Sequence, residues 1–148
     1  MRRLAGLGLA LLAAGFGTWG CGQAGGNAPE PQRVVVQHLL VSFTGRLPGK
    51  VVTRSQAEAE TLARDLLERA RRGEDFDGLV KQHTDDRHPG VYTLVNQGRS
   101  SAAGEYGREQ MVARFGDLSF RLKVGEVGLC EFDSSRSPYG YHIIKRIE

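Results

Sequence analysis

Two apolar side chains in the C-terminal third have types and spacing that suit a small binding cup. Met111 and Phe115 stand four residues apart, and on a helix beginning near Arg108 such a pair shares one face. A polarizable thioether and a flat ring can then line one wall of a compact apolar cavity. Spacing alone favours the simpler interpretation, in which both are ordinary core residues.

Two histidines interrupt otherwise apolar segments. His38 lies in the β-branched segment 34–41, and His142 lies in the C-terminal segment 139–147. A single histidine in a strand is more often a core residue with satisfied hydrogen bonds than a functional group. The four histidines of the chain lack the regular spacing of metal ligands, so we expect no metal site and no cofactor.

Two further groups have reactive side chains without the surroundings that catalysis requires. Asp85 and Asp86 stand beside His88, where turn or cap roles are the better interpretation. Cys130 lies in segment 127–132, which can bury a thiol as a small apolar group. Nothing near it in the sequence resembles a base, so the pattern does not favour a catalytic thiol.

The clearest periodicity in the chain predicts a helix over 55–72. It begins with the capping box Ser55-Gln-Ala-Glu58, and Gly73 provides a C-terminal stop. Its apolar residues repeat at helical spacing: Ala59, Leu62, Ala63, Leu66, Leu67 and Ala70. A second helix is predicted over 75–84, with Asp75 as its N-cap.

The N-terminus has the layout of an export signal. Residues 1–20 hold two arginines and then an apolar core, a pattern typical of a secretory signal and too short for a convincing permanent membrane span. Cys21 after Gly20 resembles a bacterial lipoprotein acceptor, and ordinary signal cleavage is the alternative. Residues 21–32 are rich in Gly, Ala, Pro and Gln, which predicts a flexible tether before a domain at 33–148.

The charge balance gives no indication of a nucleic-acid partner. The full chain has 20 basic and 17 acidic residues. Loss of residues 1–20 would remove Arg2 and Arg3 and no acid, which leaves 18 basic against 17 acidic residues. A net charge of this size does not predict binding to a polyphosphate.

Several fragments, taken in order, resemble the parvulin family of peptidyl-prolyl isomerases across about residues 33–148. The fragments are His38-Leu-Leu-Val41, Gln110-Met111, Phe115 with Phe120, Val124-Gly-Glu126 and Gly140-Tyr-His142-Ile-Ile144. The Gly-Asp-Leu-Gly that usually leads to the Gln-Met helix is absent, and Gly104-Glu-Tyr106 matches only its tail. Val91 to Ser101 would then form a family-specific flap, and 91–95 is also open to interpretation as an extra strand.

The resemblance implies an α+β fold with a small antiparallel sheet of four strands surrounded by about three helices. The expected strands lie near 33–43, 103–107, 126–132 and 141–147, and the expected helices near 55–72, 75–84 and 108–116. It also implies roles for individual residues. The expected catalytic residues are His38, Asp86, His142 and Thr84, and the expected substrate-binding residues are Met111, Phe115, Gln110 and Tyr106.

The implied activity is rotation of X-Pro bonds in unfolded or folding exported polypeptides, by a monomer in the cell envelope that Cys21 anchors to a membrane through lipid. Arg46 and Lys50 do not reproduce the basic cluster of phosphate-dependent members, so no phosphate requirement is expected. A catalytically inactive module that binds extended segments as a chaperone is the alternative. The missing Gly-Asp-Leu-Gly favours that module, whereas the joint presence of the two histidines, Met111 and Phe115 favours the enzyme.

Overall fold

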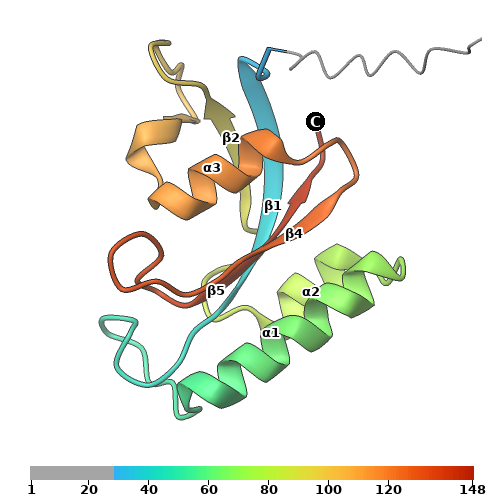
Figure 1. Ribbon diagram of the computed structural model, residues 1–148, viewed down its shortest axis with the longest axis vertical. Coiled ribbons are helices and arrows are strands. Elements are labelled where there is room, and N and C mark those ends of the chain that lie inside the picture. Colours follow the sequence, from blue (N-terminus) through green and yellow to red (C-terminus); the bar gives the residue numbers. More distant parts are fainter. Residues whose placement is uncertain (1–28) are drawn as a thin grey trace, which may run out of the picture.

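The structure, a computed structural model, describes residues 29–148 and consists of a five-stranded sheet with helices on both faces (Figure 1). The predicted signal segment and Cys21 lie outside the described residues. In chain order the elements are β1 (Arg33–Val41), α1 (Gln56–Arg71), α2 (Phe76–His83), β2 (Val91–Val95), β3 (Glu105–Gly107), the 3₁₀ helix η1 (Arg108–Gln110), α3 (Ala113–Arg121), β4 (Val127–Cys130) and β5 (Tyr141–Arg146). The α+β class is confirmed.

The sheet has one more strand than the four expected. Its order is β3-β2-β1-β5-β4, and all neighbours are antiparallel except β2 and β3, which run parallel. The interpretation of residues 91–95 as an extra strand is therefore confirmed, and the flap interpretation is wrong for them. β2 pairs with β1 from Arg33↔Val95 to Gln37↔Val91, so its backbone groups are satisfied inside the sheet rather than in a mobile loop.

Strand alternation divides the core into two layers. In β1, Leu39 and Val41 face α1 and α2, whereas Val34 and Val36 face α3. The α1 and α2 layer packs on one face of the sheet and α3 covers the other (Figure 1). Because both faces of the sheet are covered, the sequence of β1 is apolar at nearly every position instead of alternating between apolar and polar residues.

The predicted caps of the first two helices are confirmed. The Ser55 side chain accepts a hydrogen bond from the Glu58 backbone N–H, and the Glu58 carboxylate accepts one from the Ser55 N–H. Asp75 caps α2 through the Gly78 N–H at 3.1 Å. No helix among residues 29–148 has the length and apolar character needed to cross a membrane.

Loss of the Ser55 cap is expected to lower the free energy of unfolding by about 1 kcal/mol in Ser55→Ala, because the Glu58 backbone N–H at the start of α1 loses its side-chain acceptor. Chemical denaturation of the full chain measures this change. Ser100→Ala, at an exposed loop position, is the matched control. Equal stability of the two variants would show that the Ser55 side chain contributes nothing to the cap.

Candidate active site

A cavity of about 280 Å³ opens on the α3 face of the sheet. It is lined by side chains from β1, β2, β5, α3 and four connecting segments: His38, Leu40, Leu47, Asp86, Tyr92, Met111, Val112, Phe115, Tyr139 and His142. We call this cavity the cup. His38 and Leu40 follow Val34 and Val36 at intervals of two residues, so the strand period places all four on the side that α3 covers.

The two histidines and Asp86 form the floor of the cup. His38 Nε2 lies 3.2 Å from Asp86 Oδ2, and the Nδ1 atoms of His38 and His142 are 3.5 Å apart. The imidazole rings are stacked at 5.7 Å between centroids. One set of tautomers satisfies both contacts, with His142 Nδ1–H donating to His38 and His38 Nε2–H donating to the Asp86 carboxylate.

Burial and hydrogen bonding fix the charges of this floor. The hydrogen bond from His38 lowers the pKa of Asp86, so the carboxylate is anionic at neutral pH. Burial lowers the pKa of His142 to about 3, with a smaller contribution from the charge of His38. His142 is therefore neutral at pH 7, which agrees with its role as a donor to a neighbouring ring.

Thr84 and Asp85 hold the Asp86 segment against β1. Thr84 Oγ1 accepts hydrogen bonds from the backbone N–H groups of Leu40 and Asp86, at 3.1 and 3.2 Å. Asp85 accepts from the Ser42 N–H at 2.8 Å and pairs with Arg54. Thr84 does not line the cup, so the structure places it behind Asp86 rather than at the cavity surface.

The apolar wall consists of Phe115 and Met111. Phe115 is fully buried, and its ring meets His38 and His142 edge-on at 5.3 and 5.6 Å. Such edge contacts add to the apolar burial and fix the orientation of the rings. Met111 is half-buried and lines the same cavity.

The prediction that these two residues share one helix over 108–116 is wrong. The chain forms η1, closed by the Gln110 side chain accepting from the Gly107 N–H at 2.7 Å, and α3 begins only at Ala113. Met111 lies between them in an extended conformation, with φ −86° and ψ 159°. Both side chains reach the cup because the break turns Met111 toward Phe115, and not because of i, i+4 spacing.

Two of the expected substrate-binding residues do not line the cup. Gln110 is exposed and closes η1, and Tyr106 is exposed on β3 with its ring edge-on to Tyr92 at 5.6 Å. Sequence reasoning missed five lining residues: Leu40, Leu47, Tyr92, Val112 and Tyr139. Leu40 could have been found, since it stands two residues after His38 on the same strand face, whereas Leu47 and Tyr139 lie in connecting segments without periodicity.

The comparisons with known proteins decide the family. The family described as the PPIC-type PPIase domain matches residues 24–148. The chain belongs to this family. The parvulin-type resemblance is thereby confirmed, and all the lining residues of the cup lie within the matched part of the chain.

Relatives of the chain occur in bacteria and in an insect. The chain is 33% identical over 127 residues to "Chaperone SurA" of Chromohalobacter salexigens and 35% identical over 118 residues to "Foldase protein PrsA" of Geobacillus kaustophilus. These alignments cover 81% and 80% of this chain but only 24% and 38% of the relatives. The chain thus spans well under half the length of these two proteins.

A shorter relative matches over most of its length. The chain is 33% identical over 134 residues to the "Putative peptidyl-prolyl cis-trans isomerase dodo" of Drosophila melanogaster, with 86% of this chain and 72% of the relative covered. Among solved structures, the "Solution structure of the TbPIN1" matches with a TM-score of 0.58 and 22% identity. That match covers 79% of this chain and 98% of the other, and it supports the fold.

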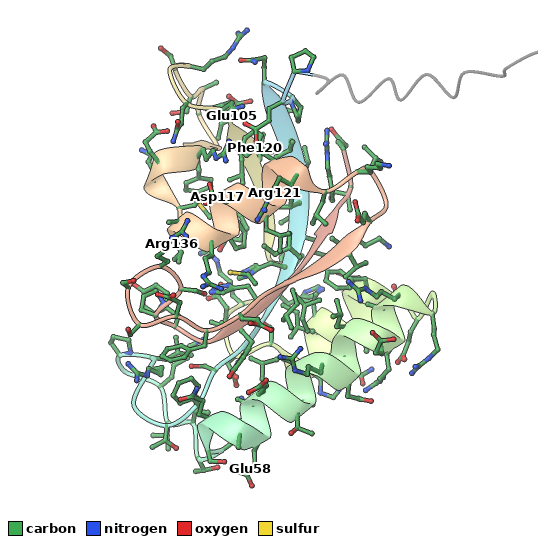
Figure 2. All side chains as sticks on the ribbon, viewed as in Figure 1. Glu58, Glu105, Asp117, Phe120, Arg121 and Arg136 are labelled. Carbon is green, nitrogen blue, oxygen red and sulfur yellow. The ribbon has the colours of Figure 1, made fainter. Side chains whose placement is uncertain are left out.

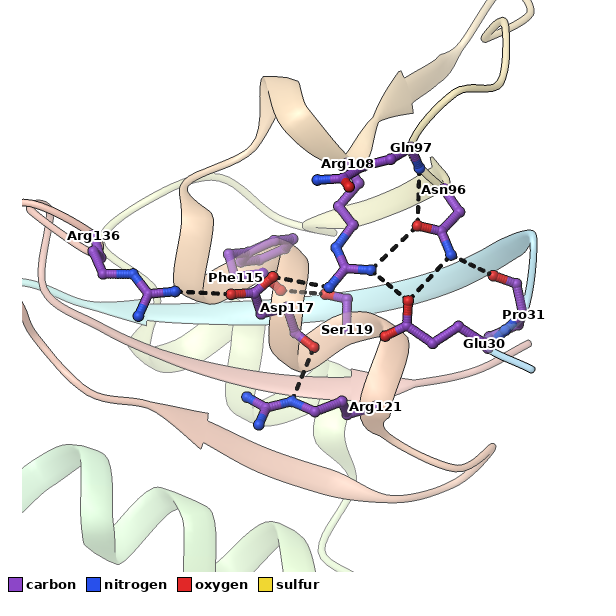
Figure 3. A network of polar contacts seen from close by, with 10 residues as sticks. All are labelled: Glu30, Pro31, Asn96, Gln97, Arg108, Phe115, Asp117, Ser119, Arg121 and Arg136. Carbon is purple, nitrogen blue, oxygen red and sulfur yellow. Dashed lines mark hydrogen bonds and ion pairs between the residues drawn. The ribbon is translucent and has the colours of Figure 1, made fainter. Parts of the chain in front are cut away.

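In this PPIC-type PPIase domain an arginine fixes α3 to the rest of the chain (Figure 3). Arg108 donates to Asp117 on α3 at 2.9 Å and to Glu30, before β1, at 2.7 Å. Its guanidinium lies 5.0 Å from the centre of the Phe120 ring. The side chain of Arg108 is only 14% exposed, so these contacts are screened less than surface pairs. They position the helix that carries Phe115.

Proposed function

We propose that this protein is a peptidyl-prolyl cis-trans isomerase that acts on unfolded or folding polypeptides. The observation that carries the proposal is the cup itself, in which an apolar wall faces an ordered floor of two histidines and a carboxylate. Its volume, about 280 Å³, is at the small end of ligand pockets and suits a single ring rather than a large ligand.

The chemistry needs no nucleophile. Rotation about an X-Pro bond has a barrier of ~18–20 kcal/mol because amide resonance is lost midway, and no covalent bond breaks. A catalyst must hold the proline ring, restrain the flanking chain and favour the twisted amide over the planar one. Met111 and Phe115 supply the apolar grip, while the hydrogen bonds from His142 through His38 to Asp86 keep the polar floor in one orientation.

The proposal includes independence from phosphate before the proline. Arg46 and Lys50, two of the cations in the loop after β1, already have intramolecular partners. The Arg46 guanidinium lies 5.2 and 4.8 Å from the centres of the Phe43 and Phe132 rings. Lys50 donates to the backbone carbonyls of Asp85 and Asp86. The two side chains therefore do not form a cluster of free cations that would bind a phosphate.

The proposal also places the domain, with boundaries at 33–148, in the cell envelope as a monomer. Residues 1–20 would direct export, Cys21 would carry the lipid, and residues 21–32 would act as the tether. The layout of the first 21 residues supports this location. The names of the relatives, a chaperone and a foldase, agree with a client that is still folding.

Turnover of short X-Pro peptides by the full chain tests the function. We expect the chain to isomerise peptides with a neutral, an acidic or a phosphoserine residue before the proline, each faster than the uncatalysed reaction. The three catalysed rates should lie within about threefold of one another, because the loop offers no phosphate site. Turnover of the phosphopeptide alone would contradict phosphate independence. No turnover with any peptide, together with protection of an unfolded protein from aggregation, would favour the inactive binding module.

A further inference from the structure

A second cavity of about 280 Å³ lies between α3 and the outer strand β4, and it shares no lining residue with the cup. We call it the arginine groove. Its lining is mostly polar and includes three arginines: Arg114, Asp117, Leu118, Arg121, Leu129, Cys130, Glu131 and Arg136. Figure 2 shows Asp117, Arg121 and Arg136 along α3 and the loop facing it.

The two acids of the groove already have cationic partners. Asp117 accepts hydrogen bonds from Arg108 and from Arg136, both at 2.9 Å. Glu131 accepts one at 2.8 Å from Arg64, an exposed residue of α1. Figure 3 shows Asp117 between the guanidinium groups of Arg108 and Arg136. The acids therefore do not neutralise the remaining arginines of the groove.

Two arginines of the groove retain donors without acceptors. Arg121 Nε donates to the Asp117 backbone carbonyl at 3.2 Å, and among residues 29–148 its terminal nitrogens have no carboxylate partner (Figure 3). Arg114 pairs with Asp133 through one terminal nitrogen, while its Nε is buried without a partner in the described part of the chain. An anionic oxygen in the groove would accept charge-assisted hydrogen bonds from the terminal nitrogens of Arg121.

The floor of the groove includes the outer edge of the sheet, which is open at Leu129, whereas the Val127 carbonyl at the start of the same strand accepts from Arg71 Nε. Arg146 donates to the Glu126 carbonyl at 3.1 Å, so in the antiparallel ladder the bonds to β5 fall on Gly128 and Cys130. The N–H and C=O of Leu129 therefore point away from β5. β4 is the outermost strand on this side of the sheet, and such an edge can pair with another extended chain.

We propose that the arginine groove binds an acidic, extended polypeptide segment. The segment adds to the edge of β4 through hydrogen bonds with Leu129, and one of its carboxylates lies between Arg121 and Arg114. Main-chain pairing supplies affinity and the arginine contacts supply the preference for acid. The groove is a second site for polypeptide, on the far side of α3 from the cup.

Binding of a labelled peptide to the full chain tests this proposal. The probe is an extended glutamate-containing peptide without proline, compared with the same peptide carrying glutamine. We expect the acidic peptide to bind at least about fivefold more tightly, with Arg121→Gln removing that preference. Slower hydrogen exchange at the Leu129 amide on peptide addition would show that the strand edge is used.

The control variant removes one arginine charge at a position outside the groove. Arg72 is an exposed arginine at the C-terminal end of α1, on the opposite face of the sheet, and Arg72→Gln should keep the preference for the acidic peptide. Equal binding of the two peptides, or an undiminished preference in Arg121→Gln, would overturn the proposal. Because the probe lacks proline, absence of isomerase activity would not alter this result.

Discussion

Phe115→Ala is expected to lower the free energy of unfolding by about 3–5 kcal/mol and to abolish turnover of X-Pro peptides. The ring is fully buried and belongs to the core layer beneath α3, together with Phe120 and Ile144. Its removal leaves a cavity that the surrounding side chains cannot fill. It also removes the edge contacts that hold the His38 and His142 rings.

Phe115→Leu separates the two effects. Leucine keeps most of the apolar volume, so its stability loss should be smaller than that of alanine. It lacks the flat ring that faces the cup, so turnover should still fall by about tenfold or more. Denaturant unfolding and peptide isomerisation on the same samples measure both quantities. Full turnover by a folded leucine variant would show that the ring is purely structural.

The stability of the protein should fall as the pH is lowered from 6.5 to 5, because His142 is neutral in the folded state. Its pKa is depressed from 6.5 to about 3, so the unfolded chain binds more protons in this interval and stability rises with pH there. One such group changes the unfolding equilibrium constant by up to about tenfold for each pH unit below 6.5. Unfolding curves at several pH values measure the slope.

Replacing the His142 imidazole should reduce this dependence of stability on pH. His142→Leu is expected to reduce the slope between pH 6.5 and 5, whereas His88→Gln, which removes an exposed imidazole, is the matched control and should keep it. Asp86, with its pKa lowered from 3.8 by the hydrogen bond from His38, loses its charge only below this interval. A slope unchanged in His142→Leu would contradict a neutral, buried His142.

Those parts of the fold that depend on local patterns could be predicted from the sequence. Ser55 and Glu58 specify the start of α1 because their side chains satisfy the backbone within one turn. The apolar runs around His38 and His142 specify strands, and their two-residue period places both rings on one face. The histidine pair of the site therefore follows from strand geometry once the two strands are neighbours.

The remainder depends on tertiary contacts that no local pattern encodes. The break after Gln110 is stabilised by the hydrogen bond of the Gln110 side chain and by the packing of α3 on Arg108. Gly116 allows this packing, because a Cβ at its position would lie only 3.0 Å from the Arg108 carbonyl oxygen. A periodicity argument continues the helix through this break and misplaces Met111. Leu47 and Tyr139 reach the cup from loops, whose paths the sequence pattern does not determine.

The most direct test of the central claim is the isomerisation rate of Met111→Ala compared with that of Leu62→Ala. Met111 lines the cup, whereas Leu62 is a partly buried side chain of α1 in the other core layer, so both variants lose apolar volume but only one alters the cup. With both shown to be folded, the account predicts that kcat/KM falls by about tenfold or more in Met111→Ala and by less than about twofold in Leu62→Ala. Equal rates in the two variants would contradict the assignment of this cavity as the proline site.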